Sequence, residues 1–245
     1  MSGGGTGAEP VLLRAEGVGK RFGGFVALQG VDVTLRPGER LGLIGPNGSG
    51  KSTFVNCVSG DFAQHDGTVT LAGQALDGLK PHRRARLGLA RTFQLPQPFG
   101  SLSVLENVRV PVLFSANAGS ATARAMECLE VVELAGKAGK LPRELTQVEQ
   151  RRLELARAVA LDPRLLIADE AMAGLSHAEV DQILALLRRL NAAGTAVIMI
   201  EHIMRAVTEF SERLVVFVAG RKVADGPPRD VLAMPEVESA YLGKQ

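Results

Sequence analysis

The chain has 245 residues, enough for one large α/β domain with a modest satellite and a substantial buried core. With 28 basic and 26 acidic residues, a net charge of +2, one Tyr and no Trp, it offers neither the basic surface nor the stacking aromatics that indicate nucleic acid as a partner. No apolar run approaches the roughly 20 residues that span a bilayer.

The N-terminal residues and the cysteines carry no sign of chemistry. Residues 1–10 are rich in Gly and lack an apolar centre, so we expect a disordered leader and not a signal peptide. Cys57 and Cys128 fall in expected helices and form no metal-type pair, which favours two reduced, partly buried thiols.

Three blocks follow one another along the rest of the chain. The first contains four stretches with the apolar patterns of strands: Val11–Ala15, Ala27–Leu35, Arg40–Ile44 and Thr68–Leu71. The second, from Gln94 to about Asp162, predicts helices over Ala121–Leu134 and Glu149–Leu161, where apolar residues recur every three or four positions. In the third, strands and helices alternate: Leu165–Ala168, Ala178–Leu190, Thr195–Ile200, Ile203–Phe210 and Arg213–Val218.

This order predicts an α/β fold. Alternating strands and helices are typical of parallel βαβ units, and strands that are apolar throughout, such as residues 197–200, are expected where helices cover both faces of a sheet. We therefore expect one domain at 11–245. Its core would comprise residues 11–93 and 163–245 and contain a mixed sheet, with an antiparallel β region near the N-terminus and an inserted helical subdomain at about 94–162.

A phosphate-binding loop stands between an apolar strand and a helix. Residues 45–53 fit the pattern G-x-x-x-x-G-K-[ST]: Gly45, Pro46, Asn47, Gly48, Ser49, Gly50, Lys51, Ser52 and Thr53. Glycines let backbone N–H groups turn toward phosphate oxygens, and the helix N-terminus favours an anion. Lys51 can neutralise the β- and γ-phosphates, and the Ser52 hydroxyl can ligate Mg²⁺. This segment predicts nucleotide binding.

Two carboxylates end the strand that begins at Leu165. Asp169 suits a Mg²⁺ shell, directly or through water, and Glu170 suits a base that deprotonates or orients water. Because ligands of parallel sheets bind beyond the carboxyl ends of the strands, both acids are expected to meet the phosphate loop. Without that loop, a solvated strand end would be the better interpretation.

Two neutral side chains are further candidates for the same site. His202 follows the next apolar strand, within reach of a γ-phosphate, where its N–H could donate to developing charge; a structural histidine is the alternative. Gln94 stands where the strand-rich block ends, and its amide could ligate Mg²⁺, although by itself it would be unremarkable.

A helix start with a capping box follows at residues 145–149. Thr146 and Glu149 have the spacing of a capping box, so the helix is expected to begin there and to present its positive end outward. On local grounds alone, this is simply a well-capped helix.

In this order, the segments resemble the nucleotide-binding subunit of ABC transporters over essentially the whole chain. The resemblance implies an ABC-type P-loop NTPase with a RecA-like core that uses ATP and Mg²⁺. It implies that Phe22 stacks on adenine, although a core phenylalanine is the alternative, and that Gln94, Ser52 and Asp169 serve the metal. Glu170 and His202 would be catalytic, and a signature segment would contact the partner's ATP: Leu145, Thr146, Gln147, Val148 and Glu149.

Three further stretches resemble the branched-chain amino acid importers: residues 91–94, 173–176 and 235–243. The signature segment departs from the family's Leu-Ser-Gly-Gly-Gln. Thr146 keeps the hydroxyl, but Gln147 and Val148 replace both glycines and Glu149 replaces glutamine. Ala171 and Ser176 stand where the family has proline and aspartate.

The resemblance implies an ATP-hydrolysing subunit of an importer for branched-chain amino acids or related small solutes. Its partners would be membrane permease subunits, a second ATPase subunit, identical or sister, and indirectly an extracytoplasmic solute-binding protein. It would lie at the cytoplasmic face of the inner or plasma membrane. The alternatives are a soluble ABC-type ATPase, which usually has tandem cassettes or a coiled-coil insertion, and a weakly active regulatory subunit, which the altered signature segment favours.

Overall fold

Six strands form the larger sheet of the computed structural model, which describes residues 10–94, 96–114 and 120–242. The strand order is β10-β9-β3-β8-β7-β6. All neighbours pair in parallel except β9 and β10, which are antiparallel, so the sheet is mixed as predicted. The strands are β3 (Arg40–Ile44), β6 (Leu89–Arg91), β7 (Leu165–Asp169), β8 (Ala196–Ile200), β9 (Arg213–Val218) and β10 (Arg221–Gly226).

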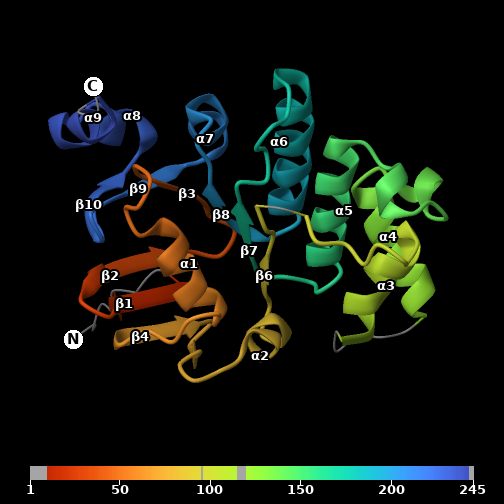
Figure 1. Cartoon of the computed structure of the whole chain (residues 1–245), viewed down its shortest axis with the longest axis horizontal. Coiled ribbons are helices and arrows are strands. Elements are labelled where there is room, and N and C mark those ends of the chain that lie inside the picture. Colours follow the sequence, from red (N-terminus) through yellow and green to blue (C-terminus); the bar gives the residue numbers. More distant parts are fainter. Residues whose placement is uncertain (1–9, 95, 115–119, 243–245) are drawn as a thin grey trace, which may run out of the picture.

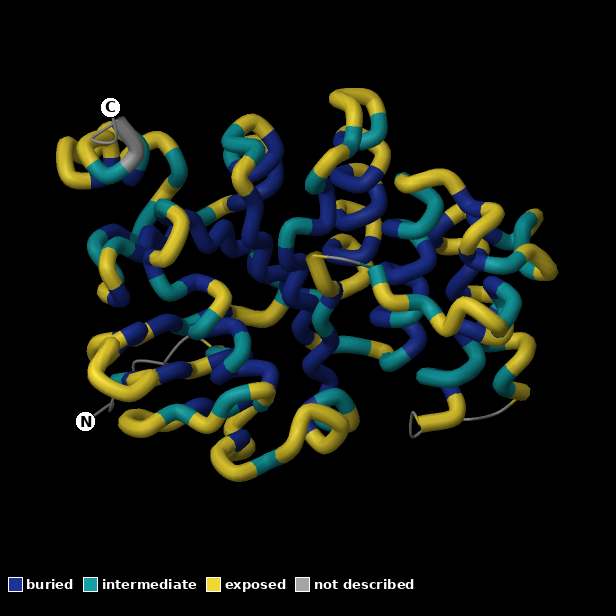
Figure 2. The backbone as a smooth tube through the Cα atoms, in the orientation of Figure 1, coloured by how far each residue is buried: buried dark blue, intermediate teal, exposed yellow. Residues whose placement is uncertain are grey.

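Both faces of this sheet are covered. Along β7, Leu165 and Ile167 pack into one apolar cluster, and Leu166 and Ala168 pack into the other. Every residue of β7 and β8 is buried, which explains why both strands are apolar almost throughout (Figure 2).

A smaller antiparallel sheet confirms the predicted N-terminal β region. Its order is β2-β1-β4-β5, with bounds β1 (Leu13–Phe22), β2 (Phe25–Leu35), β4 (Asp66–Leu71) and β5 (Gln74–Ala75). Strand β1 runs seven residues beyond the predicted end at Ala15, because bulges interrupt its pairing with β2 and so break the simple alternation of the sequence. Helix α1 (Lys51–Ser59) lies between the two sheets (Figure 1), and its Phe54 and Val58 join their shared core.

Helices cover the other face and extend away from it (Figure 1). Helices α5 (Gln147–Val159), α6 (His177–Ala192) and α7 (Met204–Phe210) contribute to the larger apolar cluster, as do α3 (Val104–Phe114) and α4 (Ala121–Val131). Helix α4 ends three residues before the predicted Leu134, because Glu133 adopts a left-handed conformation with φ 60°. Cys57 in α1 and Cys128 in α4 are buried free thiols, as expected.

The sequence signals of the remaining elements were too short or too mixed to predict them. They are α2 (Pro81–Arg86), the 3₁₀ turns Ala135–Lys137 and Pro142–Glu144, α8 (Pro228–Leu232) and α9 (Pro235–Leu242), besides β5, β6, β10 and α3. Helix α3 contains Pro111, and α2 consists mainly of cationic residues. The predicted disordered leader lies outside the described residues except for Pro10. Within the described ranges, no helix has the length and apolar character needed to cross a membrane.

Candidate nucleotide site

The phosphate loop connects β3 to α1 and touches two other strands. A Cβ at Gly45, whose φ is 149°, would stand 2.1 Å from the carbonyl oxygen of Phe217 in β9. A Cβ at Gly50, with φ 105°, would stand 2.8 Å from the carbonyl oxygen of Ala27 in β2. Only glycine fits these positions without moving backbone, so both sheets hold the loop in its curved form.

Lys51 is a buried cation inside this loop. Its Nζ donates to the carbonyl oxygens of Gly45 at 2.7 Å and Pro46 at 3.1 Å. Burial lowers the pKa of the ammonium, while the charges of Glu170 and Asp169 act in the opposite direction. Lys51 is 6% exposed and its ammonium is bonded only to neutral carbonyls, so a nearby anion would stabilise this buried charge, and phosphate oxygens would supply one.

The loop also holds an orphaned polar atom. The buried Oγ of Ser49 has no hydrogen-bond partner among the described residues. A cavity of about 200 Å³ opens beside the loop and is lined by Phe25, Ala27, residues 47–53, Glu170 and His202. Larger hollows of about 300, 590 and 640 Å³ are lined by no residue of the loop and by none of the predicted catalytic residues.

The ends of β7 and β8 meet at this cavity. Asp169 pairs with Ile200 across the parallel strands, and the N–H of Glu170 donates to the carbonyl oxygen of Ile200 at 2.9 Å. Glu170 therefore lies beside His202, whose Nε2 stands 3.2 Å from Oε1 of the carboxylate. Glu170 has φ 47°, an unfavourable conformation for a residue with a side chain, and such strain is concentrated at functional sites.

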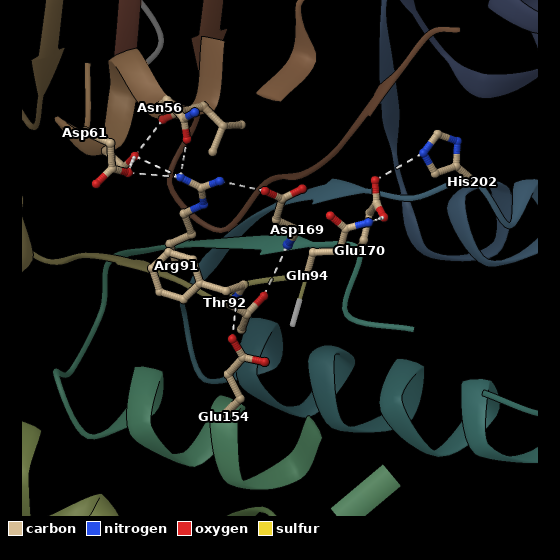
Figure 3. Close-up of polar contacts among 12 residues, drawn as sticks. Asn56, Asp61, Arg91, Thr92, Gln94, Glu154, Asp169, Glu170 and His202 are labelled. Atoms are coloured by element: carbon tan, nitrogen blue, oxygen red, sulfur yellow. Dashed lines mark hydrogen bonds and ion pairs between the residues drawn. The ribbon is translucent and has the colours of Figure 1, made fainter. Parts of the chain in front are cut away.

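The other oxygen of Glu170 accepts a hydrogen bond from the side-chain amide of Gln94 (Figure 3). Three predicted site residues from three separate segments thus converge: Gln94 after β6, Glu170 after β7 and His202 after β8. A carboxylate with a donor on each oxygen is held in one orientation beside the phosphate loop.

Asp169 faces away from this cluster, toward an arginine that sequence reasoning missed. Nη2 of Arg91 donates to Oδ2 of Asp169 at 2.8 Å (Figure 3). Nη1 of Arg91 reaches α1 and the residues after it, donating to Asn56 at 2.6 Å and Asp61 at 3.0 Å. One guanidinium therefore ties the predicted metal-binding carboxylate to the helix that follows the phosphate loop.

The signature segment begins α5, away from the cavity. The predicted capping box is present: the N–H of Glu149 donates to Oγ1 of Thr146, and the N–H of Thr146 donates to the Glu149 carboxylate. The Lys137 ammonium also bonds to Glu149, and these contacts lower the pKa of its carboxyl. Thr146 and Gln147 are exposed and Val148 is half-buried, so this helix end faces outward.

Phe22 is not among the residues that line the cavity. Its ring is 44% exposed and meets the ring of Phe62 edge-on at 5.4 Å, with Nζ of Lys20 5.3 Å from the ring centre. Phe25, its partner across the hairpin, lines the cavity instead. Two exposed aromatic residues, Phe22 and Phe25, are thus paired at this hairpin, and only Phe22 was predicted to stack on a base.

Three buried acidic or basic residues were also missed. Arg151 and Glu154 in α5 contact the main chain at residues 93–94, and Glu201 at the end of β8 accepts from the N–H of Met172 at 2.8 Å. Burial raises the pKa of Glu154 to about 6 and that of Glu201 to about 7. Glu201 directly follows the apolar strand β8, which was a signal available in the sequence, whereas Arg151 and Glu154 are two of many polar residues of α5 and could not be singled out.

Comparisons with known proteins agree with this geometry. A family model described as ABC transporter matches residues 28–173. The high-affinity branched-chain amino acid transport ATP-binding protein LivG of Salmonella typhimurium is 37% identical, over 95% of this chain and 98% of that protein. The ADP conformation of MJ1267, an ATP-binding cassette of an ABC transporter, has a TM-score of 0.88 and 29% identity, covering 96% of this chain and 99% of the other. A dimeric cassette bound to ADP and Pi, MJ0796, has a TM-score of 0.80 and 27% identity, covering 89% and 99%.

The buried carboxyl of Glu201 gives a prediction about pH. Because its pKa is about 7 in the folded chain against an ordinary value of 4.5, the folded chain binds the proton more tightly and loses stability as pH rises from about 4.5 to 7. Glu201→Gln removes this dependence. The stability of the variant relative to wild type should therefore increase by up to about 3 kcal/mol between pH 4.5 and 8, measured by urea unfolding.

Glu179, which is partly exposed at the start of α6, provides a control with the opposite sign. Hydrogen bonds from Ser176 lower the pKa of its carboxyl, so Glu179→Gln should lose stability relative to wild type as pH rises. A stability difference between wild type and Glu201→Gln that is the same at both ends of the pH range would contradict the assignment of a buried, proton-retaining carboxyl.

Proposed function

Because this chain belongs to the ABC transporter family, we propose that it is the ATP-binding and ATP-hydrolysing subunit of an importer. The observation that carries the proposal is that Glu170 and His202 line one cavity together with the phosphate loop, while Gln94 bonds to the Glu170 carboxylate. Branched-chain amino acids or related small solutes are the proposed cargo, because relatives such as LivG are named for that transport.

The loop would bind the nucleotide phosphates. Its N–H groups, the dipole of α1 and the buried Lys51 ammonium all favour a polyanion, and the orphaned Ser49 hydroxyl offers one more donor. Adenine would stack on Phe22, with Phe25 beside the sugar or base. The role of Phe22 rests on the family resemblance, since Phe25 is the ring that lines the cavity.

Ser52, Gln94 and Asp169 would hold Mg²⁺, which would neutralise phosphate charge when bound. Among the described residues, no group of three or more His, Cys, Asp or Glu side chains is placed to hold a metal by itself. A hydroxyl and an amide suit a hard cation that takes its other ligands from phosphates and water, and Asp169, whose Oδ2 accepts from Arg91, would act on it through water.

Glu170 would accept the proton of the attacking water, and His202 would donate to charge that develops on the γ-phosphate. Gln94 now occupies one oxygen of Glu170, and His202 stands beside the other. Movement of the Gln94 amide would free that oxygen for water, so the position of Gln94 would control hydrolysis.

The complete site would need a second ATPase subunit, identical or sister. The outward-facing N-terminus of α5, with Leu145, Thr146, Gln147, Val148 and Glu149, would meet the ATP held by the other subunit. The Thr146 side chain takes only one of the first N–H groups of α5, so others are available to phosphate oxygens. The charge of Glu149 is already paired with Lys137, which reduces its repulsion of that phosphate.

The remaining partners follow from the family. Membrane permease subunits would receive the motion near Gln94, and an extracytoplasmic solute-binding protein would deliver cargo, which places this subunit at the cytoplasmic face of the membrane. A weakly active regulatory subunit is the second candidate, and the replacement of both signature glycines by Gln147 and Val148 favours it.

Two substitutions test the proposed activity together. Lys51→Ala should weaken ATP binding roughly 10- to 100-fold, because it removes the fixed cation from the phosphates.

Glu170→Gln should keep ATP affinity but lower turnover by roughly 100-fold or more, and should accumulate an ATP-bound dimer, since the base is lost and the phosphate loop remains. Calorimetry, ATPase assays and size-exclusion chromatography with ATP measure these effects. Unchanged affinity in Lys51→Ala would count against nucleotide binding at the loop, and a purely monomeric Glu170→Gln with ATP would count against the composite site.

Val148 allows a test of the altered signature segment. The Val148 side chain is partly buried against the larger apolar cluster. Val148→Gly should therefore lower the free energy of unfolding by about 0.5–1 kcal/mol. If the β-branched side chain keeps the backbone from the partner's γ-phosphate, the same variant should nevertheless raise ATP hydrolysis or ATP-driven dimerisation. In a heterodimer one site should respond, and in a homodimer both should. Unchanged turnover with the partner subunit and permease present would show that the departure has no functional effect.

A further inference from the structure

Helix α5 carries two buried ionic residues one turn apart, Arg151 and Glu154, which are 4% and 6% exposed. Neither residue lines the cavity beside the phosphate loop. Arg151 instead contacts main-chain carbonyl oxygens at residues 93–94 and at Ala173, and Glu154 contacts the main-chain N–H of Phe93. Burying a charged side chain costs free energy unless hydrogen bonds and an opposite charge compensate for the lost water, so the partners of Arg151 and Glu154 are essential to their burial.

Arg151 joins two segments that are far apart in the sequence. Its Nη1 donates to the carbonyl oxygen of Gln94 at 2.6 Å and to that of Phe93 at 3.3 Å. Its Nη2 donates to the carbonyl oxygen of Ala173, three residues after Glu170, at 3.4 Å. One planar guanidinium therefore spans the main chain before and after the reacting groups, a geometry that a single ammonium cannot reproduce.

Glu154 completes the attachment from the same face of α5. Its carboxylate accepts the N–H of Phe93 (Figure 3), and it lies 3.9 Å from the Arg151 guanidinium. The main chain at Phe93 is thus held through both its N–H and its carbonyl oxygen. The next residue, Gln94, is the one whose side chain bonds to Glu170.

We propose that Arg151 and Glu154 are positioning residues that transmit the position of α5 to Gln94 and, through it, to Glu170. This inference rests on the proposed function, because it gives the helix that meets the partner's ATP a direct mechanical link to the water-activating carboxylate of its own chain. When α5 moves, the main chain of Gln94 and Ala173 moves with it. Docking of α5 against the partner's ATP therefore changes the rate of hydrolysis in the site of its own chain.

Arg151→Lys tests the proposal in the full-length chain, with Arg152→Lys as the matched control. Lysine keeps the charge beside Glu154 but cannot donate to Gln94 and Ala173 together. Arg152 occupies the next position of α5 and bonds to Glu133 and Gln182 instead, away from the site. Arg151→Lys should lower kcat roughly 10-fold or more and leave the calorimetric Kd for ATP within about twofold, since misplacement of reacting groups affects turnover more than binding. Arg152→Lys should change neither value.

A double-mutant cycle separates positioning from simple packing. If Arg151 acts through Gln94, combining Arg151→Lys with Gln94→Ala should lower kcat no further than Gln94→Ala does alone. Glu154→Gln, which keeps an oxygen for the Phe93 N–H, should retain more turnover than Glu154→Ala. Additive effects in the cycle, or equal losses in Arg151→Lys and Arg152→Lys, would overturn the inference. A wild-type chain that does not hydrolyse ATP would instead overturn the proposed function, so the two failures are distinguishable.

Discussion

The parallel register of β3, β8 and β7 is the constraint on which the site depends. It brings the ends of three strands, which stand at Ile44, Ile200 and Asp169 in the sequence, to one edge of the sheet. Every residue of β7 and β8 is buried, with successive side chains in opposite apolar clusters. A slip by one residue would exchange these sets, so the register is strongly specified. The pairing of the main chain is thus sufficient to place Glu170 beside His202, without any contact between their side chains being required.

Arginine side chains then connect this edge to the helices around it. Arg91 joins Asp169 to the end of α1, and Arg151 joins Gln94 and Ala173 to α5. Both guanidiniums are largely buried and use several donors at once, which is the arrangement that arginine serves better than lysine. This edge of the sheet is therefore linked both to α1, which follows the phosphate loop, and to α5, the helix proposed to meet a partner subunit.

Sequence reasoning was most successful where the determinant is local. The phosphate loop needs glycines, a lysine and a hydroxyl at fixed spacing before a helix, and the capping box of Thr146 and Glu149 needs two residues three positions apart, so both could be predicted. The contact between Arg91 and Asp169 spans 78 residues and exists only because β6 lies beside β7, an order that periodicity does not give. Phe25 and Phe22 are equally aromatic, and only the hairpin geometry places Phe25 against the cavity. The short elements α2 and β6 escaped prediction because six and three residues carry too little periodic signal.

The central claim is that one ATP is held between the phosphate loop of one chain and the signature segment of another. A structure of Glu170→Gln bound to ATP and Mg²⁺ tests it most directly. The account predicts the γ-phosphate at Lys51, with His202 of the same chain nearby and Thr146 of a second subunit on its opposite side. Nucleotide bound away from Lys51, or a nucleotide-bound dimer in which no signature segment faces the phosphates, would contradict it.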